Sequence, residues 1–350
     1  MLFDLRPKET REELYDREKE LDELKHAIEK PIILITGMRL VGKSSLLKVF
    51  LKECAFPNAF VTVPHIYSHI FTIFSNILTQ LNKKSPGKIF SNVLKHIAGV
   101  KVYDIEIKLS WKERRANLQD IFEQVNRIGK KVIIAIDEAQ NFKGKFEKHI
   151  TSLLTYCYDN CKNITFILTG SEVGELYDLL GVDSYDSPFF GRHIEYIKLK
   201  PFSKNMSIEF LKKGFLQHKM NVDEDLIEYA VDRLDGVVGW LTEVGSIAVG
   251  RGVLTKELID EAVEKAMNVI ISSLKYLEKK YLYIIEAIAK GYKSEGEIKN
   301  FLEHKMGYKI ESFEITRYLR SLENMGYITK VQEKYEFLSP LLDYVAKRMF

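Results

Sequence analysis

The stretch ITGMRLVGKSSLLKVF, residues 35–50, constrains the fold of this chain more than any other segment. An apolar run leads into a loop bracketed by Gly37 and Gly42, and helix-forming residues begin at Ser44. In this order of strand, glycine loop and helix, the glycines let backbone N–H groups curl around an anion, and the positive end of the helix adds to the field. By itself the segment is also compatible with an ordinary turn, so the neighbouring motifs have to distinguish a phosphate-binding loop from a turn.

The loop fits the pattern G-x-x-x-x-G-K-[ST] at each position, which predicts binding of the phosphates of ATP or ADP. Lys43 would set a cation against the β- and γ-phosphates, and Ser44 offers a hydroxyl to Mg²⁺. Arg39, inside the loop, could contact either a phosphate or a neighbouring lid. The candidate nucleotide-contacting residues are Gly37, Met38, Arg39, Leu40, Val41, Gly42, Lys43, Ser44 and Ser45.

A second apolar run, VIIAIDE, ends in two adjacent carboxylates. Ligand sites of parallel sheets open at the carboxyl ends of the strands, so Asp137 is placed to hold Mg²⁺ together with Ser44. Glu138 is placed to orient a water and take its proton during attack on the γ-phosphate. Such a water favours hydrolysis over transfer to a small-molecule acceptor. The alternative is that both carboxylates only cap the following helix.

Apolar runs alternate with amphipathic segments through the N-terminal part of the chain. Strands are predicted at 31–36, 59–63, 131–140, 164–170 and 193–199, and helices at 44–53, 68–81, 111–128 and 146–161. Segment 83–110 has less pattern and is expected to be a loop or a hairpin insertion. The alternation predicts a parallel sheet covered by helices on both faces, which is an α/β fold.

The strand pattern stops near residue 202, and the rest of the chain reads differently. Residues 203–270 are predicted to be helical, with caps at Ser207 and Asp223 and a break at DGVVGW. Helices at 279–290, 294–305 and 311–325, short strands in GYITKV and KYEFLS, and a last helix give the order of a winged helix-turn-helix. We expect three domains: an α/β core at 1–202, an all-α lid at 203–274 and a winged helix at 275–350.

Composition limits the partners. The 350 residues carry a formal charge of +3, so nucleic-acid binding would need a local basic patch. The three cysteines, Cys54, Cys157 and Cys161, lack the paired spacing of a zinc site, and we expect reduced thiols. The N-terminus is charged, and no apolar run approaches the ~18 residues of a membrane span. These observations favour a cytoplasmic protein without a membrane partner.

Taken together, the motifs resemble those of the archaeal-type P-loop ATPases of the STAND/AAA+-related group. The resemblance rests on YDREKELDEL (15–24), GMRLVGKSS, IIAIDEAQ, ITFILTGSEVG and SPFFGRHIEYIKLKPFS (187–203), followed by helices and a winged helix. It covers nearly the whole chain. It implies ATP binding and hydrolysis on an AAA+-like core.

The resemblance also implies contacts with the base of the nucleotide. An upstream R-E-x-E-L element, here Arg17, Glu18, Glu20 and Leu21, lies near the adenine in such folds. Tyr15, Asp16 and Arg17 are therefore candidates for contact with the base. A solvated acidic helix start would look the same in sequence. Pro201, in the segment after the last strand, is a further candidate for nucleotide contact.

Further roles near the γ-phosphate follow from the same resemblance. Thr169 or Ser171 corresponds to the polar residue that hydrogen-bonds the attacking water, although Thr-Gly-Ser is also an ordinary turn. Arg192 corresponds to an arginine that reaches phosphate in its own chain or in a neighbour, and a salt bridge at a domain edge is the alternative. The chain departs from the group at 235–241, where DGVVGWL replaces a Gly-Gly-x-Pro element, so lid contact with nucleotide stays open.

The winged helix could bind DNA, dock a protein partner or another copy of the chain, or pack against the core. DNA reading needs a helix that enters the major groove with basic and amide side chains. The candidate helix offers Arg317 and Arg320 but also carries Glu311, Glu314 and Glu323. The sequence therefore leaves DNA and protein partners open.

These features predict an Mg²⁺-dependent ATPase whose work is conformational. Nucleotide would hold the lid and the winged helix against the core, and hydrolysis or exchange would release them. One alternative is a nucleotide-gated regulatory or DNA-binding protein with negligible turnover. Another is a small-molecule kinase, against which Glu138 argues.

Overall fold

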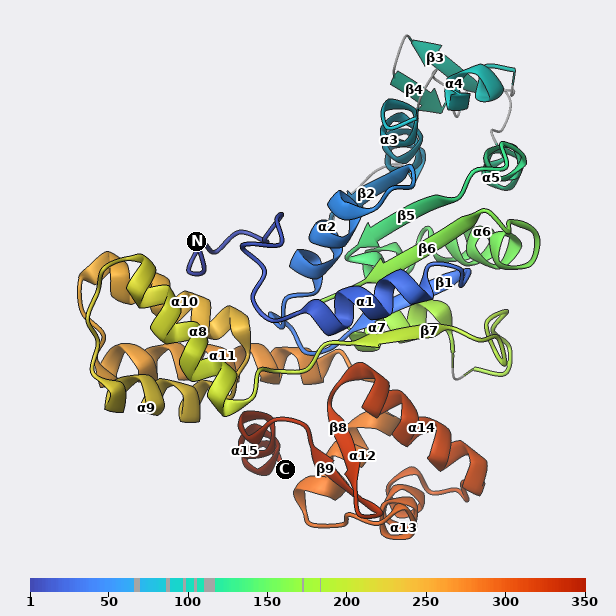
Figure 1. The fold of residues 1–350 in the computed structure, drawn as a ribbon. Helices are drawn as coiled ribbons and strands as arrows, with labels where there is room; N and C mark the ends of the chain where they lie inside the picture. The colour runs from blue at the N-terminus through green and yellow to red at the C-terminus, as the bar shows by residue number, and fades with distance from the viewer. Residues whose placement is uncertain are drawn as a thin grey trace.

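The computed structural model describes residues 1–65, 70–85, 89–96, 99–103, 106–109, 117–171, 173–182 and 184–350. Figure 1 shows a central sheet with its helices and a second group of helices beside it. The C-terminal elements form a third group, whose last helix lies near the second group. The predicted α/β core, helical region and winged helix are all present in this order. No helix in the described ranges combines the length and the apolar character needed to cross a membrane.

Parallel strands form the central sheet in the order β2-β5-β6-β1-β7. Their bounds are β1 (Ile32–Thr36), β2 (Asn58–Thr62), β5 (Val132–Asp137), β6 (Ile164–Thr169) and β7 (Glu195–Lys198). β6 separates β1 from β5, so the strands that lead into the glycine loop and into the carboxylate pair lie close together. All residues of β1, β5 and β6 are buried, as in strands covered on both faces.

Helices cover the two faces of the sheet, and the side chains of β1 alternate between them. Ile33 and Ile35 pack with the first two helices, whereas Ile32 and Leu34 belong to the larger core on the other face. The helices of this part are α1 (Glu18–Ala27), α2 (Lys43–Glu53), α3 (Ile70–Lys83), α5 (Leu118–Arg127), the short 3-10 helix η2 (Ala139–Phe142), α6 (Glu147–Asn160) and α7 (Val173–Leu180). Neither η2 nor α7 was expected from the sequence.

The segment between α3 and α5 is the predicted insertion. It contains α4 (Ile89–Leu94) and an antiparallel hairpin of β3 (Val100–Tyr103) and β4 (Glu106–Leu109). In the described part of the helix predicted at 111–128, α5 follows Asn117, whose side chain accepts a hydrogen bond from the Gln119 N–H. The first residues of that predicted helix, 111–116, lie outside the described ranges.

Four helices follow the sheet: α8 (Lys204–Gln217), α9 (Glu224–Leu234), α10 (Val238–Arg251) and α11 (Lys256–Lys275). Asp223 caps α9 as predicted. The predicted cap at Ser207 is wrong, because α8 starts a turn earlier with Ser203 accepting the Met206 N–H, and Ser207 is buried inside the helix. Because Ser203 and Ser207 carry the same hydroxyl group, their side chains do not show which of them caps α8. The path of the backbone after β7 decides it.

The C-terminal part has the predicted winged-helix order. It consists of α12 (Lys279–Ala289), α13 (Glu295–Met306), α14 (Ser312–Met325), the antiparallel pair β8 (Ile328–Val331) and β9 (Lys334–Phe337), and α15 (Pro340–Met349). α15 packs on α11 and α12, and α14 contacts β7 of the sheet. The helix predicted to read DNA therefore lies against the core in this arrangement, as Figure 1 also shows.

Candidate functional site

A cavity of about 310 Å³ lies at the carboxyl ends of the parallel strands, where such sites are expected. Most of the predicted site residues line it, including Tyr15, Arg17, Arg39, Leu40, Val41, Gly42, Lys43, Ser44, Ser45, Asp137, Glu138, Thr169 and Ser171. Gly37 and Met38 line a smaller adjoining cavity, together with Arg39 and Ser171. Arg192 and Pro201 belong to neither lining.

The glycine loop has a geometry that its sequence requires. Gly37 and Gly42 have φ angles of 136° and 103°, which side chains other than glycine rarely adopt. A Cβ at Gly37 would also stand 2.4 Å from the carbonyl oxygen of Leu199, at the end of β7. Inside the loop the buried Lys43 ammonium donates to the carbonyl oxygens of Gly37 at 2.8 Å and Met38 at 2.9 Å.

Asp137 joins the loop to the neighbouring strands. Its Oδ2 accepts a hydrogen bond from the Ser44 hydroxyl at 2.9 Å, and its Oδ1 accepts one from the Thr169 hydroxyl at 2.6 Å. The three groups come from α2, β5 and β6 and are partly or fully buried. Hydroxyl and carboxylate oxygens are the hard ligands that Mg²⁺ prefers, so this donor set fits the predicted ion.

Glu138 is held in a strained backbone conformation, with φ at 55°. Its Oε2 accepts hydrogen bonds from the Ser171 N–H at 3.1 Å, the Ser171 hydroxyl at 2.7 Å and the Gln140 amide. The side chain makes no capping bond to η2, contrary to the capping alternative. The carboxylate instead points across the strand ends, toward the residues that follow β6.

Gln140 is a site residue that the sequence analysis missed. Its Nε2 donates to Glu138 and lies 3.4 Å from the Ser171 hydroxyl, while its Oε1 is buried without a hydrogen-bond partner among the described residues. A Cβ at Gly170 would stand 2.3 Å from that oxygen, so the glycine leaves room for the amide. The only sequence signal was its place two residues after Glu138.

Arg17 lines the cavity and also joins two segments of the core, and its predicted contact with the base stays a prediction. It is buried, and its guanidinium donates to the carbonyl oxygens of Val41 at 3.2 Å and Lys200 at 2.9 Å, pairs with Glu20, and lies over the Phe202 ring. Burial lowers the pKa of this guanidinium from its ordinary value. Arg17 thereby ties the glycine loop to the segment after β7.

Tyr15 contacts the cavity with a ring that is already packed. It meets Phe202 and Phe210 edge to face at centroid distances of 5.6 and 5.4 Å. Burial, with a hydrogen bond to Glu209, raises the pKa of its phenol to about 12. An aromatic wall of this kind suits a flat base, so the predicted adenine contact stays a prediction with a surface to support it.

Arg192 lies away from the cavity. Its guanidinium pairs with Asp159, donates to the Pro188 carbonyl oxygen at 2.7 Å and lies over the Tyr158 ring. Within one chain, Arg192 therefore forms the salt bridge that was the alternative to a phosphate contact. Contact with phosphate from a neighbouring subunit stays a prediction.

The helical region touches the loop despite its altered DGVVGWL element. The Gly239 N–H donates to the Leu40 carbonyl oxygen at 2.9 Å, and a Cβ at Gly239 would stand 2.6 Å from the Leu40 Cβ. Val238 and Thr242 line the main cavity. The lid therefore packs on the glycine loop itself through the first turn of α10.

The N-terminal segment, residues 2–8, is the largest part of the cavity wall that the sequence analysis missed. Leu2, Asp4, Leu5, Arg6, Pro7 and Lys8 all line the cavity. Its mixture of charges gave no signal of this role. Only the path of the chain across the site reveals it.

Comparison with known proteins gives the family. Residues 14–244 match the family described as "ATPase domain predominantly from Archaea", and residues 275–338 match the "MCM protein C-terminal winged helix-turn-helix domain". The Walker-type ATPase of Pyrococcus abyssi is 33% identical over 99% of this chain and 100% of that chain, with a TM-score of 0.67. No curated protein matches the sequence.

Two more distant structures are also similar. Cdc6p of Pyrobaculum aerophilum is 13% identical over 99% of this chain and 97% of its own, with a TM-score of 0.46. A Pyrococcus horikoshii signal-transduction ATPase with numerous domains and a tetratricopeptide-repeat sensor is 17% identical over 98% of this chain and 44% of its own, with a TM-score of 0.40. From the motifs, the fold and the first of these comparisons, the chain belongs to the family of ATPase domains found predominantly in Archaea, with an MCM-like winged helix at its C-terminus.

Proposed function

We propose that this protein is an Mg²⁺-dependent ATPase in which the nucleotide bound at the glycine loop controls the docking of the winged helix. One observation carries the proposal: the turn after α14 lies directly on the loop. A Cβ at Gly326 would stand 3.2 Å from the Gly37 Cα and 3.6 Å from the Met38 nitrogen. A change in the loop therefore acts on the winged helix without an intermediary.

The side chains at the strand ends support hydrolysis. Lys43 would neutralise the phosphates, and Ser44 with Asp137 would hold Mg²⁺, which supplies charge neutralisation between the β- and γ-phosphates. Glu138 would take the proton of the attacking water, and Thr169 and Ser171 would orient the groups around it.

The contacts of Glu138 favour a second candidate, a regulatory protein with slow turnover. Its Oε2 already accepts hydrogen bonds from Ser171 and Gln140, so this oxygen is occupied before any water approaches it. The base would have to leave these donors before each turnover. Nucleotide would then persist as a bound signal between rare hydrolytic events.

Division into a core at 1–202, a lid at 203–274 and a winged helix at 275–350 is part of this proposal. Ser203 caps the first helix after the sheet, and α11 ends at Lys275, so both boundaries fall beside helix ends. The parts meet around the loop, where a small cavity is lined by Trp240 of α10, Ile270 of α11 and Tyr327 of the winged helix.

DNA is the proposed partner, and docking limits its access. Arg317 of α14 lies over the rings of Tyr185 and Phe190, at 4.9 and 5.4 Å, in the segment between α7 and β7. Phe313 in the first turn of α14 also meets Tyr185 edge to face. The same helix cannot enter a major groove while it makes these contacts, so DNA binding would require release from the core.

Hydrogen exchange of α14 tests the proposal. We expect the Glu138→Gln variant to show different amide protection of residues 312–327 with Mg²⁺-ATP than with Mg²⁺-ADP. The γ-phosphate is present in only one of these complexes and would alter the loop that Gly326 contacts. Lys43→Ala, which removes the phosphate-binding cation, should show no nucleotide effect. Equal protection of the Glu138→Gln variant in both complexes, with binding of each nucleotide verified, would contradict the proposed coupling between the glycine loop and α14.

A further inference from the structure

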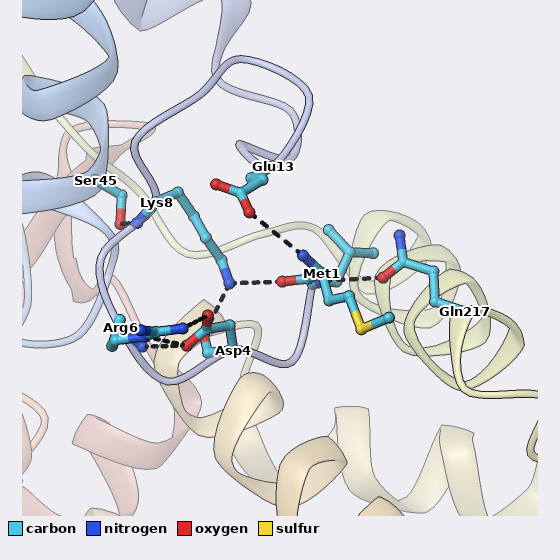
Figure 2. Close-up of polar contacts among 8 residues, drawn as sticks. Met1, Asp4, Arg6, Lys8, Glu13, Ser45 and Gln217 are labelled. Carbon is cyan, nitrogen blue, oxygen red and sulfur yellow. Dashed lines mark hydrogen bonds and ion pairs between the residues drawn. The ribbon is translucent and has the colours of Figure 1, made fainter.

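The N-terminal segment spans the mouth of the main cavity between the lid and the core. Figure 1 shows it running between α10 and α2, and Figure 2 shows its polar contacts at close range. At the lid end, the Leu2 N–H donates to the Gln217 Oε1 of α8 at 2.9 Å. At the core end, the Lys8 N–H donates to the Ser45 hydroxyl of α2 at 3.0 Å. We call residues 2–8 the strap.

The lid end of the strap is anchored by Phe3. Its ring is only 3% exposed and meets Phe210 and Phe215 edge to face, with centroids 5.9 and 5.0 Å away. A Cβ at Gly214 of α8 would stand 2.2 Å from this ring, and one at Gly245 of α10 would stand 2.4 Å from it. The two glycines therefore make a socket that larger residues would fill.

The core end of the strap lies beside the phosphate-binding helix. Ser45, which accepts the Lys8 N–H, is in the first turn of α2, next to the candidate Mg²⁺ ligand Ser44. Lys8, Ser44 and Ser45 all line the same cavity. The backbone of Lys8 is thus hydrogen-bonded to the residue next to Ser44, the candidate Mg²⁺ ligand.

The charge of Lys8 is held by neutral partners. Its ammonium donates to the carbonyl oxygens of Met1 and Asp4, both at 2.8 Å. The Asp4 carboxylate is instead engaged by the Arg6 guanidinium, at 3.1 and 2.8 Å, and Glu13 pairs with the amino group of Met1. Burial lowers the pKa of the Lys8 ammonium, as expected for a cation without a bonded carboxylate.

We propose that Lys8 is a phosphate-binding residue of the nucleotide site, carried there by the strap. The inference rests on the proposed nucleotide binding and adds a second lysine, which comes from the strap and lines the same cavity as Lys43. A phosphate oxygen is a stronger partner for an ammonium than a carbonyl oxygen, because both members of the hydrogen bond are then charged. Since Phe3 fixes the strap in the lid, this contact would also make nucleotide affinity sensitive to the position of the lid.

Calorimetric titration of wild type, Lys8→Gln and Lys8→Arg with ATP, ADP and adenosine in the presence of Mg²⁺ tests the proposal. One lost charge-assisted hydrogen bond corresponds to about a tenfold loss of affinity. We expect that loss in Lys8→Gln for ATP and ADP, little change for adenosine, and near-complete recovery in Lys8→Arg. Lys52→Gln, which removes an exposed lysine from the last turn of α2, serves as the matched control.

The outcomes separate this inference from the proposed function. If wild type binds ATP and Lys8→Gln binds it equally well, Lys8 is not a phosphate ligand, whereas the ATP site stands. If wild type binds no nucleotide, both proposals fail. An equal loss for adenosine would show that Lys8 only shapes the strap, and it would overturn the phosphate assignment.

A variant of the anchor tests the role of the strap separately. Phe3→Ala empties the glycine socket and should weaken ATP binding, whereas Phe3→Leu should retain most of it. Thermal unfolding without nucleotide checks that each variant is folded. Unchanged ATP affinity in a folded Phe3→Ala variant would contradict a strap that positions Lys8.

Discussion

At the scale of single residues, the site depends on several side chains that donate hydrogen bonds to the same few carboxylate oxygens. Asp137 already accepts from Ser44 and Thr169, and one oxygen of Glu138 accepts from Ser171 and Gln140. The carboxylate assigned to the predicted water is therefore already held by three hydrogen bonds. This explains how one site could bind nucleotide firmly and still turn it over slowly.

Substitution of two residues separates binding from turnover. Lys43→Ala should abolish ATP binding, because it removes the buried cation of the loop. Glu138→Gln should bind ATP but lose turnover by roughly 10²- to 10⁴-fold, the usual contribution of a general base. Nucleotide titration and phosphate release measure the two effects. Normal hydrolysis by Glu138→Gln would refute the assigned base.

At the scale of elements, a pair of carboxyl groups joins the core to the winged helix. Asp178 of α7 hydrogen-bonds Glu278 at the start of α12, with Lys143 at 3.0 Å from Asp178 and Lys280 at 2.9 Å from Glu278. Burial raises the pKa of the Asp178 carboxyl to about 7, whereas the same hydrogen bond and Lys280 lower that of Glu278. The pair therefore shares a proton in mildly acidic solution.

The stability of this contact should fall as the pH rises. An ordinary aspartate has a pKa of 3.8, so between about pH 4 and 7 the folded state binds a proton that the unfolded chain does not. From pH 6 to pH 8 we expect a loss of about 1 kcal/mol in the free energy of unfolding. Asp178→Asn, which keeps a donor for Glu278, should remove most of that dependence. Denaturant titrations at both pH values measure it, and an equal loss in the variant would count against the pair.

At the scale of the whole molecule, the glycine loop is the meeting point of three parts of the chain. The lid reaches it through the Gly239 N–H, the winged helix through Gly326, and the strap reaches the following helix through Lys8. Close-packed contacts of this kind transmit small displacements, because neighbouring groups have no free space to absorb them. A nucleotide bound at the loop would thus be sensed by all three.

Two glycines of the winged helix make a matched test of this arrangement. Gly326 and Gly307 end α14 and α13 with φ angles of 85° and 76°, so alanine should cost each about 1 kcal/mol of stability through backbone strain. Only at Gly326 would the new Cβ press on Gly37, since nothing lies within 4 Å of one at Gly307. We expect altered ATP affinity in Gly326→Ala alone. Equal ATP affinities in both variants would show that the contact of Gly326 with Gly37 does not affect nucleotide binding at the loop.

The sequence by itself determined most of the elements and the candidate site residues at the ends of two strands. Continuous apolar runs predicted the buried strands, and the glycine pattern with the carboxylates that end VIIAIDE located the cavity, because these signals are carried by neighbours along the chain. The order of three helices and a hairpin predicted the winged helix in the same way. Even the cap of α9 at Asp223 followed from local hydrogen bonding, whereas the choice of Ser203 over Ser207 for α8 did not.

Only the tertiary structure decided which distant residues meet at the loop. The contacts of Lys8 with Ser45, Arg17 with Lys200, and Gly37 with Gly326 join segments that share no periodicity and no motif. It also kept Arg192 out of the cavity, paired with Asp159. Such contacts depend on how whole elements pack, and a charged residue looks the same in sequence whether it faces solvent, a salt-bridge partner or a phosphate. Local pattern therefore located the candidate phosphate site, and packing determined what surrounds it.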